Sequence, residues 1–139
     1  MGSRRKGRII AFQALYGWDA THNPIDSVLA FDWVDGKRDA EAYDDTIGFA
    51  RLITAGTIEN IDAVDDAIKA RLKHWDFSRL SRVDLAILRM SVYCLLYQTD
   101  IPRSVTIDEA IDIAKEFGGD GSYKFVNGVL DGVGKAEIV

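Results

Sequence analysis

The segment from residue 81 to residue 97, SRVDLAILRMSVYCLLY, decides the fold. Ser81 is suited to accept a hydrogen bond at the start of a helix, and Asp84 follows three residues later in a shortened form of the capping box. Beyond Asp84, apolar side chains fall on all sides of the predicted helix, which is typical of a helix at the centre of a bundle. The apolar run contains Arg89 and is too short to span a bilayer. The segment therefore predicts a buried central helix and no membrane association.

The segments on either side of it also have helical patterns. Apolar residues recur at spacings of three and four, and no segment alternates with period two. Asn23-Pro24 combines a capping side chain with a ring that suits the first helical turn, and Thr106 with Glu109 forms a full capping box. Gly118-Gly119 indicates a helix end. We therefore expect an all-α protein with helices over residues 3–18, 24–33, 43–54, 60–72, 81–96, 106–117 and 122–133.

The composition is that of one folded domain. The chain has 139 residues, of which 47% are apolar and 28% charged, so we expect residues 1–139 to form a single unit. Residues 1–3 are expected to be disordered or to come from cloning. The lone cysteine, Cys94, excludes an intrachain disulfide framework, and its place in the central helix predicts a core residue in a reducing, cytoplasmic compartment. The two histidines, His22 and His74, are far apart, so we expect no metal site. The glycine-containing segments lack the spacing of a phosphate-binding loop, and the carboxylates are typical of a solvated helical face, so we expect no cofactor and no enzymatic activity.

Basic residues gather at the start of the chain. The first eight residues hold four of them and no acid, whereas the remainder holds 13 basic and 22 acidic residues, a net charge of −9. Such a head can bind nucleic acid, because phosphate contacts depend on local rather than net charge. A solvated terminus is the alternative interpretation. The four residues are Arg4, Arg5, Lys6 and Arg8.

Aromatic residues follow the basic head on the same predicted helix. Phe12 is expected in the core, whereas Tyr16 is left open between core and surface. Arginine forks beside exposed aromatic faces favour single-stranded RNA. In the last predicted helix, Phe125 lies outside the buried stripe and is expected at a binding site rather than in the core. Gly128 and Gly132 share one face of that helix, which indicates a close approach to another helix.

Three segments resemble the bacterial transcription antitermination factor family NusB. They are RRKGRIIAFQALYGWD at residues 4–19, RLSRVDLAILRMSVYCLLY at 79–97, and DIPRSVTIDEAIDIAKEFG with SYKFVNGVLDGV at 100–118 and 122–133. The resemblance implies a compact bundle of seven helices in two small helical subdomains, with a role that is not enzymatic. It further implies binding to single-stranded boxA RNA together with the ribosomal protein NusE, in the elongating RNA polymerase complex, to suppress termination in ribosomal RNA operons.

The resemblance also assigns site residues. Asp84 and Tyr16 match positions near the NusE surface, although Asp84 is shorter than the glutamate common there. The family often carries an acid where this chain has Gly121. A helical protein–protein adaptor without an RNA site is the alternative, and an attached methyltransferase domain is not expected because the chain ends at Val139. The RNA-binding residues implied are Arg4, Arg5, Lys6, Arg8, Gln13, Tyr16, Lys124 and Phe125.

Overall fold

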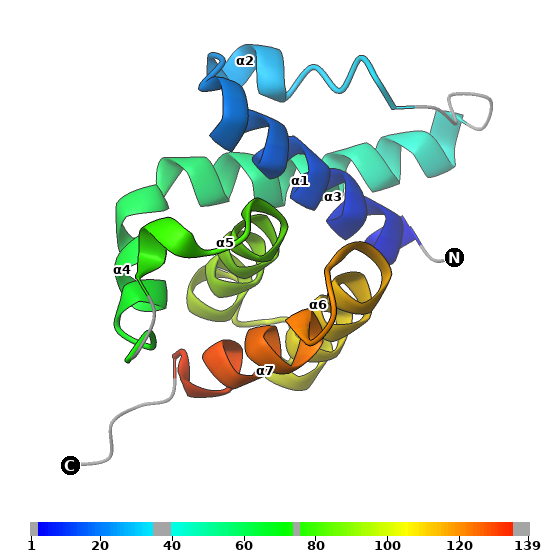
Figure 1. Ribbon diagram of the computed structural model, residues 1–139. Helices are drawn as coiled ribbons and strands as arrows, with labels where there is room; N and C mark the ends of the chain where they lie inside the picture. The colour runs from blue at the N-terminus through cyan, green and yellow to red at the C-terminus, as the bar shows by residue number, and fades with distance from the viewer. Residues whose placement is uncertain (1–2, 35–39, 74–75, 135–139) are drawn as a thin grey trace.

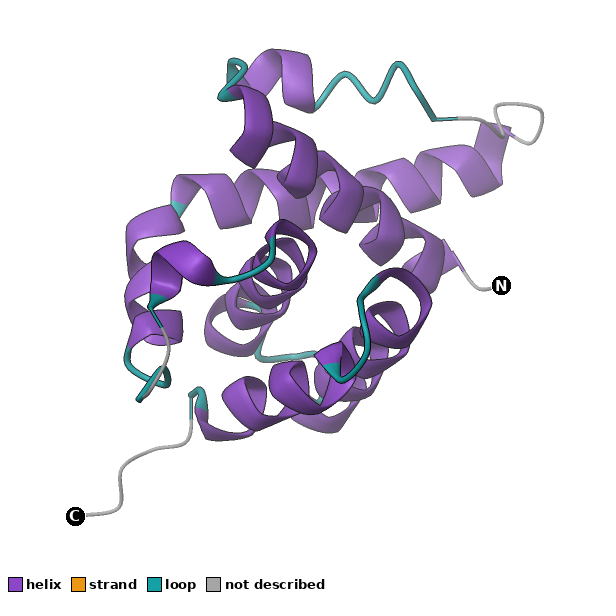
Figure 2. Ribbon diagram, viewed as in Figure 1, coloured by secondary structure: helices purple, strands orange, loops and turns teal. Residues whose placement is uncertain are grey.

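The structure, a computed structural model, describes residues 3–34, 40–73 and 76–134. In these ranges the chain forms seven α-helices and one short 3-10 helix, with no strand (Figure 2). The expected all-α fold is therefore confirmed. Met1 and Gly2 lie outside the described residues, and Ser3 begins the first helix. The elements are α1 (Ser3–Thr21), α2 (Ile25–Val28), α3 (Ala40–Glu59), α4 (Ile61–Lys69), η1 (Phe77–Arg79), α5 (Arg82–Tyr97), α6 (Arg103–Phe117) and α7 (Ser122–Gly132).

Helix α5 lies at the centre of the bundle. Every residue from Leu85 to Cys94 is buried, and α1, α3, α4, α6 and α7 all contact this helix (Figure 1). The physical reason is the apolar surface on all sides of α5, which only a full ring of neighbours removes from water. The predicted cap forms as well, because Ser81 Oγ accepts a hydrogen bond from the backbone N–H of Asp84 at 3.0 Å.

A second, smaller cluster of buried residues lies between α1 and α3. It is built around Phe31, which packs with Ile10 and Ile47. Phe31 has a φ of 51°, so the chain turns back after α2 instead of continuing as a helix. The expected helix over 24–33 is thus wrong in its extent: α2 is one turn, Asn23 is not its cap, and Trp33 is largely exposed. Burial of the Phe31 ring outweighs the helical pattern of this segment.

The N-cap of helix α6 lies four residues earlier than its capping box predicted. Pro102 is the N-cap, and Thr106 is a buried residue inside the helix. The early start is stabilised by Arg103, whose Nη2 donates to the carbonyls of Leu130 at 2.7 Å and Asp131 at 2.9 Å. These carbonyls lie at the carboxyl end of α7, where a cation is favoured by the helix dipole. A contact to a distant helix therefore decided this boundary.

Two glycines allow helices to cross closely. A Cβ on Gly7 would lie 2.9 Å from Phe49 Cδ2, and one on Gly56 would overlap the Tyr93 ring. The close approach expected at Gly128 and Gly132 is wrong. No atom lies within 4 Å of where a Gly128 Cβ would stand, and Gly132 is covered by the Arg71 side chain rather than by another helix.

A buried ion cluster joins α1, α4 and α5. Arg89 donates from Nε and Nη2 to the two Asp65 oxygens, both at 2.9 Å, and from Nη1 to Asp19 at 3.0 Å. Arg82 also reaches Asp19, at 3.1 Å. Burial opposes the charge of Arg89, but the hydrogen bonds to the two carboxylates outweigh burial and raise its pKa. The cluster fixes the end of α1 against the start of α5, beside the candidate site described next.

Candidate nucleic-acid interface

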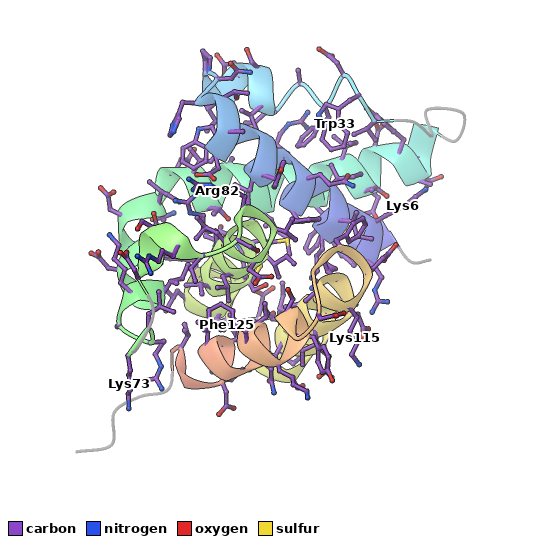
Figure 3. The ribbon with its side chains drawn as sticks, viewed as in Figure 1. Lys6, Trp33, Lys73, Arg82, Lys115 and Phe125 are labelled. Atoms are coloured by element: carbon purple, nitrogen blue, oxygen red, sulfur yellow. The ribbon has the colours of Figure 1, made fainter. Side chains whose placement is uncertain are left out.

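The four head cations of α1 have different surroundings. Arg4 and Lys6 are exposed, and neither lies within ion-pair distance of a carboxylate in the described part of the chain. Figure 3 shows Lys6 at the surface of the bundle. The Arg4 guanidinium lies 4.4 Å from the centre of the Phe49 ring, which holds it beside α3 while leaving it in contact with solvent. These two cations are available to an anionic ligand.

Arg8 is a core residue. It is 5% exposed, its guanidinium lies 5.1 Å from the Phe49 ring centre, and its Nη1 is 4.0 Å from Glu109 Oε1. Burial is the largest influence on Arg8 and lowers its pKa. In this conformation Arg8 supports the packing of α1 on α3 and α6, and its side chain is too buried to contact an RNA phosphate.

Arg5 is held by two carboxylates of α6. Its Nε donates to Glu109 Oε2 at 2.5 Å and its Nη2 donates to Asp112 Oδ2 at 2.6 Å. The hydrogen bond to Glu109 makes the largest contribution to the raised pKa of Arg5. Because Glu109 and Asp112 are three residues apart, they share one face of α6. A phosphate that binds Arg5 must therefore compete with these two acids.

The aromatic residues of α1 divide between core and surface. Phe12 is buried, and its ring centre lies 5.3 Å from that of Phe117 at the end of α6, so its expected core position is confirmed. Tyr16 is 44% exposed, which settles the question that the sequence left open, and Gln13 is exposed as well. Tyr16 stands one turn beyond Phe12 and one turn before Asp19, which pairs with Arg82 at the start of α5.

A cavity of about 360 Å³ lies between the start of α5 and the start of α7. Tyr16 is not among the lining residues, but Phe12 and Asp19, each one turn away from it on α1, contact Phe117 and Arg82, which are near the lining segments in the sequence. Gly121, at φ 81°, adopts the left-handed conformation that brings the chain into α7. The lining residues are Arg79, Leu80, Ser81, Asp84, Asp120, Gly121, Ser122 and Phe125.

Two of the predicted site residues meet in this cavity. Phe125 points from α7 toward α5 (Figure 3), lines the cavity and also packs against the main core, so its expected exclusion from the core is wrong. Asp84 Oδ1 is buried and accepts no hydrogen bond from the described residues. An acceptor in this state costs free energy that a donor from a bound molecule would recover. Lys124, one residue before Phe125, is exposed.

The remaining residues considered for catalysis or metal binding are the cysteine and the two histidines. Cys94 is buried, and burial raises the pKa of its thiol to about 11, as expected of a core residue. His22 is exposed, and His74 lies outside the described residues. Among the residues that the structure places, no three His, Cys, Asp or Glu side chains gather as metal ligands, and no helix has the length and apolar character to span a membrane.

Comparisons with known proteins agree in assigning this architecture. The model of the NusB family matches residues 5–135. The transcription antitermination protein NusB of Treponema pallidum (strain Nichols) is 47% identical over 133 residues, covering 96% of this chain and 93% of that protein. The structure of T. maritima NusB superposes with a TM-score of 0.82 at 40% identity and covers 96% of this chain and 91% of that one.

A more distant structure shares the fold alone. It contains the antitermination factors NusB and NusE in complex with dsRNA, and it superposes with a TM-score of 0.79 at 24% identity. It covers 96% of this chain and 97% of that one.

Proposed function

The chain belongs to the NusB family, and from this premise we propose that it binds single-stranded boxA RNA together with NusE and promotes processive transcription of ribosomal RNA operons in the cytoplasm. In this role it acts as a single RNA-binding domain within the elongating RNA polymerase complex and catalyses no reaction. The relatives that match along nearly the whole chain are transcription antitermination proteins, which supports the role.

One observation carries the RNA-binding part of the proposal. Arg4 and Lys6 are exposed cations without a carboxylate partner among the described residues, on a body whose net charge outside the first eight residues is −9. Such local positive charge suits phosphates. The aromatic faces of Tyr16 and Phe125 supply stacking surfaces for unpaired bases, and Lys124 adds a cation beside Phe125.

The partner surface is proposed at Tyr16 and Asp84. The related structure that holds NusE supports a ribosomal-protein partner by its shared fold. The acidic body would attract a basic protein and speed the encounter. The unpartnered Asp84 Oδ1 would then accept a hydrogen bond from NusE, which compensates for its burial.

The RNA site is tested by the double variant Arg4→Gln with Lys6→Gln. Loss of two phosphate contacts should reduce the slope of log K against log salt by about 1.4, at about 0.7 per phosphate of a single strand. The melting temperature should change little, because both side chains are exposed and the contact of Arg4 with the Phe49 ring is worth about 0.5–1 kcal/mol at an exposed site. Arg51→Glu is the matched control, since one substitution at an exposed position on α3 changes the net charge equally. A slope that stays the same in the double variant would place the RNA elsewhere.

The partnership is tested by calorimetry of NusE binding with and without boxA RNA. If NusE tightens RNA binding, RNA must tighten NusE binding by the same factor. Tyr16→Ala should weaken the NusE complex, whereas the control Tyr97→Ala, at a tyrosine of similar exposure (45%) at the far end of α5, should not. Equal NusE affinities in both titrations would show uncoupled sites, as in a simple adaptor or a lone RNA binder.

A further inference from the structure

A second basic segment lies between the end of α4 and the start of α5. The 14 residues from 69 to 82 hold five cations and one acid, whereas residues outside 4–8 and 69–82 hold eight cations and 21 acids. Of the 17 basic residues, nine are thus concentrated in two short segments. The five cations, all exposed, are Lys69, Arg71, Lys73, Arg79 and Arg82.

Most of this charge is uncompensated. Arg82 pairs with Asp19, and the Lys69 ammonium lies 4.9 Å from the centre of the Phe77 ring. For Arg71, Lys73 and Arg79, no carboxylate of the described residues lies within ion-pair distance. The one acid, Asp76, is engaged locally, since its Oδ1 accepts from the backbone N–H of Ser78 at 3.0 Å and from the Ser78 hydroxyl at 2.8 Å.

The described cations of this segment lie along α7 and reach the cavity. Arg79 lines the cavity together with Phe125, in the first turn of α7. Arg71 lies at the other end of that helix, where its guanidinium covers Gly132. Figure 3 shows Lys73 near the carboxyl end of α7, with Phe125 between Lys73 and the start of α1. The basic segment is therefore continuous with the cavity, on the side away from the head cations.

We propose that the exposed cations Lys69, Arg71, Lys73, Arg79 and Arg82 form a second phosphate-binding surface, over which single-stranded RNA continues after it leaves the cavity. The inference rests on the RNA-binding function proposed above and extends its footprint. Cations that follow a groove next to an aromatic side chain are typical of proteins that bind single strands, because the cations meet the backbone while bases stack. An acidic protein partner would pair with the cations, but it would leave the adjoining Phe125 ring and the cavity without a binding role.

The test combines RNA length with charge. The complex of this protein with NusE is titrated with a boxA RNA and with the same RNA lengthened by six uridines at either the 5′ or the 3′ end. The variant is Arg71→Gln with Lys73→Gln, two exposed cations that do not line the cavity, and Arg51→Glu is again the charge-matched control. Thermal unfolding verifies the fold. If loss of Arg71 lowers the melting temperature, Lys73→Gln alone replaces the double variant, Arg51→Gln becomes its charge-matched control, and the expected change in salt slope is about 0.7.

We expect one of the two extensions to tighten binding to the wild-type protein and to the control, and the variant to lose that gain. For the extended RNA the salt slope should fall by about 1.4 in the variant, at about 0.7 for each of two phosphates. The two substitutions should therefore weaken binding of the extended RNA roughly sevenfold more at 50 mM salt than at 200 mM salt. The short RNA should bind the variant and the wild-type protein equally.

The outcomes separate the two proposals. If the wild-type complex binds boxA RNA but gains nothing from either extension, or if the variant keeps the gain, the second surface is wrong and the proposed function stands. If the variant and the control lose the same affinity, the effect is general electrostatics and the second surface is again wrong. If the wild-type complex binds none of the three RNAs, the proposed function itself is wrong.

Discussion

Replacement of Asp112 by asparagine should strengthen RNA binding. Asp112 and Glu109 hold Arg5 on the α6 face, so an RNA phosphate that binds Arg5 must displace these carboxylates or share the guanidinium with them. Asp112 is the better residue to change, because its side chain is 48% exposed, whereas Glu109 also lies beside the buried Arg8. Asp112→Asn removes one competing charge and leaves the core intact.

The structure sets the size of the effect. The side chains of Arg5 and Asp112 are 36% and 48% exposed, so their ion pair belongs to the exposed class, worth about 0.2–1 kcal/mol. RNA would no longer have to compete with that pair, which corresponds to about 1.4- to 5-fold tighter binding at low salt. The free energy of unfolding should fall by no more than about 1 kcal/mol, for the same reason.

The assay is a fluorescence titration of labelled boxA RNA at several salt concentrations, with unfolding by urea measured in parallel. Asp108→Asn is the matched control, because Asp108 is exposed on α6 one turn earlier, has the same charge and makes no ion pair with Arg5. The gain should be larger for Asp112→Asn than for the control, and it should shrink as salt screens the pair. Equal gains in the two variants would refute the competition, and weaker binding of Asp112→Asn would show that RNA uses Asp112 itself.

Three further predictions concern the core, the cavity and the thiol. Arg89→Leu leaves the largely buried Asp65 without a counterion and leaves Asp19 with the exposed Arg82 alone, so it should cost about 3–5 kcal/mol of unfolding free energy in urea. Arg82→Leu, at a side chain that is 63% exposed, should cost less than about 1 kcal/mol. Similar losses for the two would mean that the buried cluster adds nothing. Phe125→Ala should weaken RNA binding by about 1–3 kcal/mol, the range for a stacking aromatic, in titrations well below the variant's lowered melting temperature; unchanged affinity of the folded variant would assign Phe125 to packing alone. Because burial raises the pKa of the Cys94 thiol to about 11, the folded protein should resist iodoacetamide at pH 8 and react only as it unfolds, and fast labelling under native conditions would contradict that burial.

Much of the fold follows from local patterns. The central helix, its Ser81 cap and the core positions of Phe12 and Cys94 depend on neighbours within one or two turns, and each expectation was confirmed. The predicted extent of the helix over 24–33 is wrong, because burial of Phe31 against α1 and α3 competes with local helix propensity. The local sequence pattern does not reveal that distant contact.

The candidate site shows the same division between local and distant causes. The sequence by itself determined that positive charge gathers at residues 4–8, that Phe125 lies in the first turn of the last helix and that the chain folds as helices, since charge and periodicity can be read along the chain. Only the tertiary structure decided which cations are free. Arg5 and Arg8 meet Glu109, which is more than 100 residues away, and this contact leaves Arg4 and Lys6 as the exposed pair. Electrostatic pairing acts through space over a few ångströms, so its partners become known only when the helices have packed.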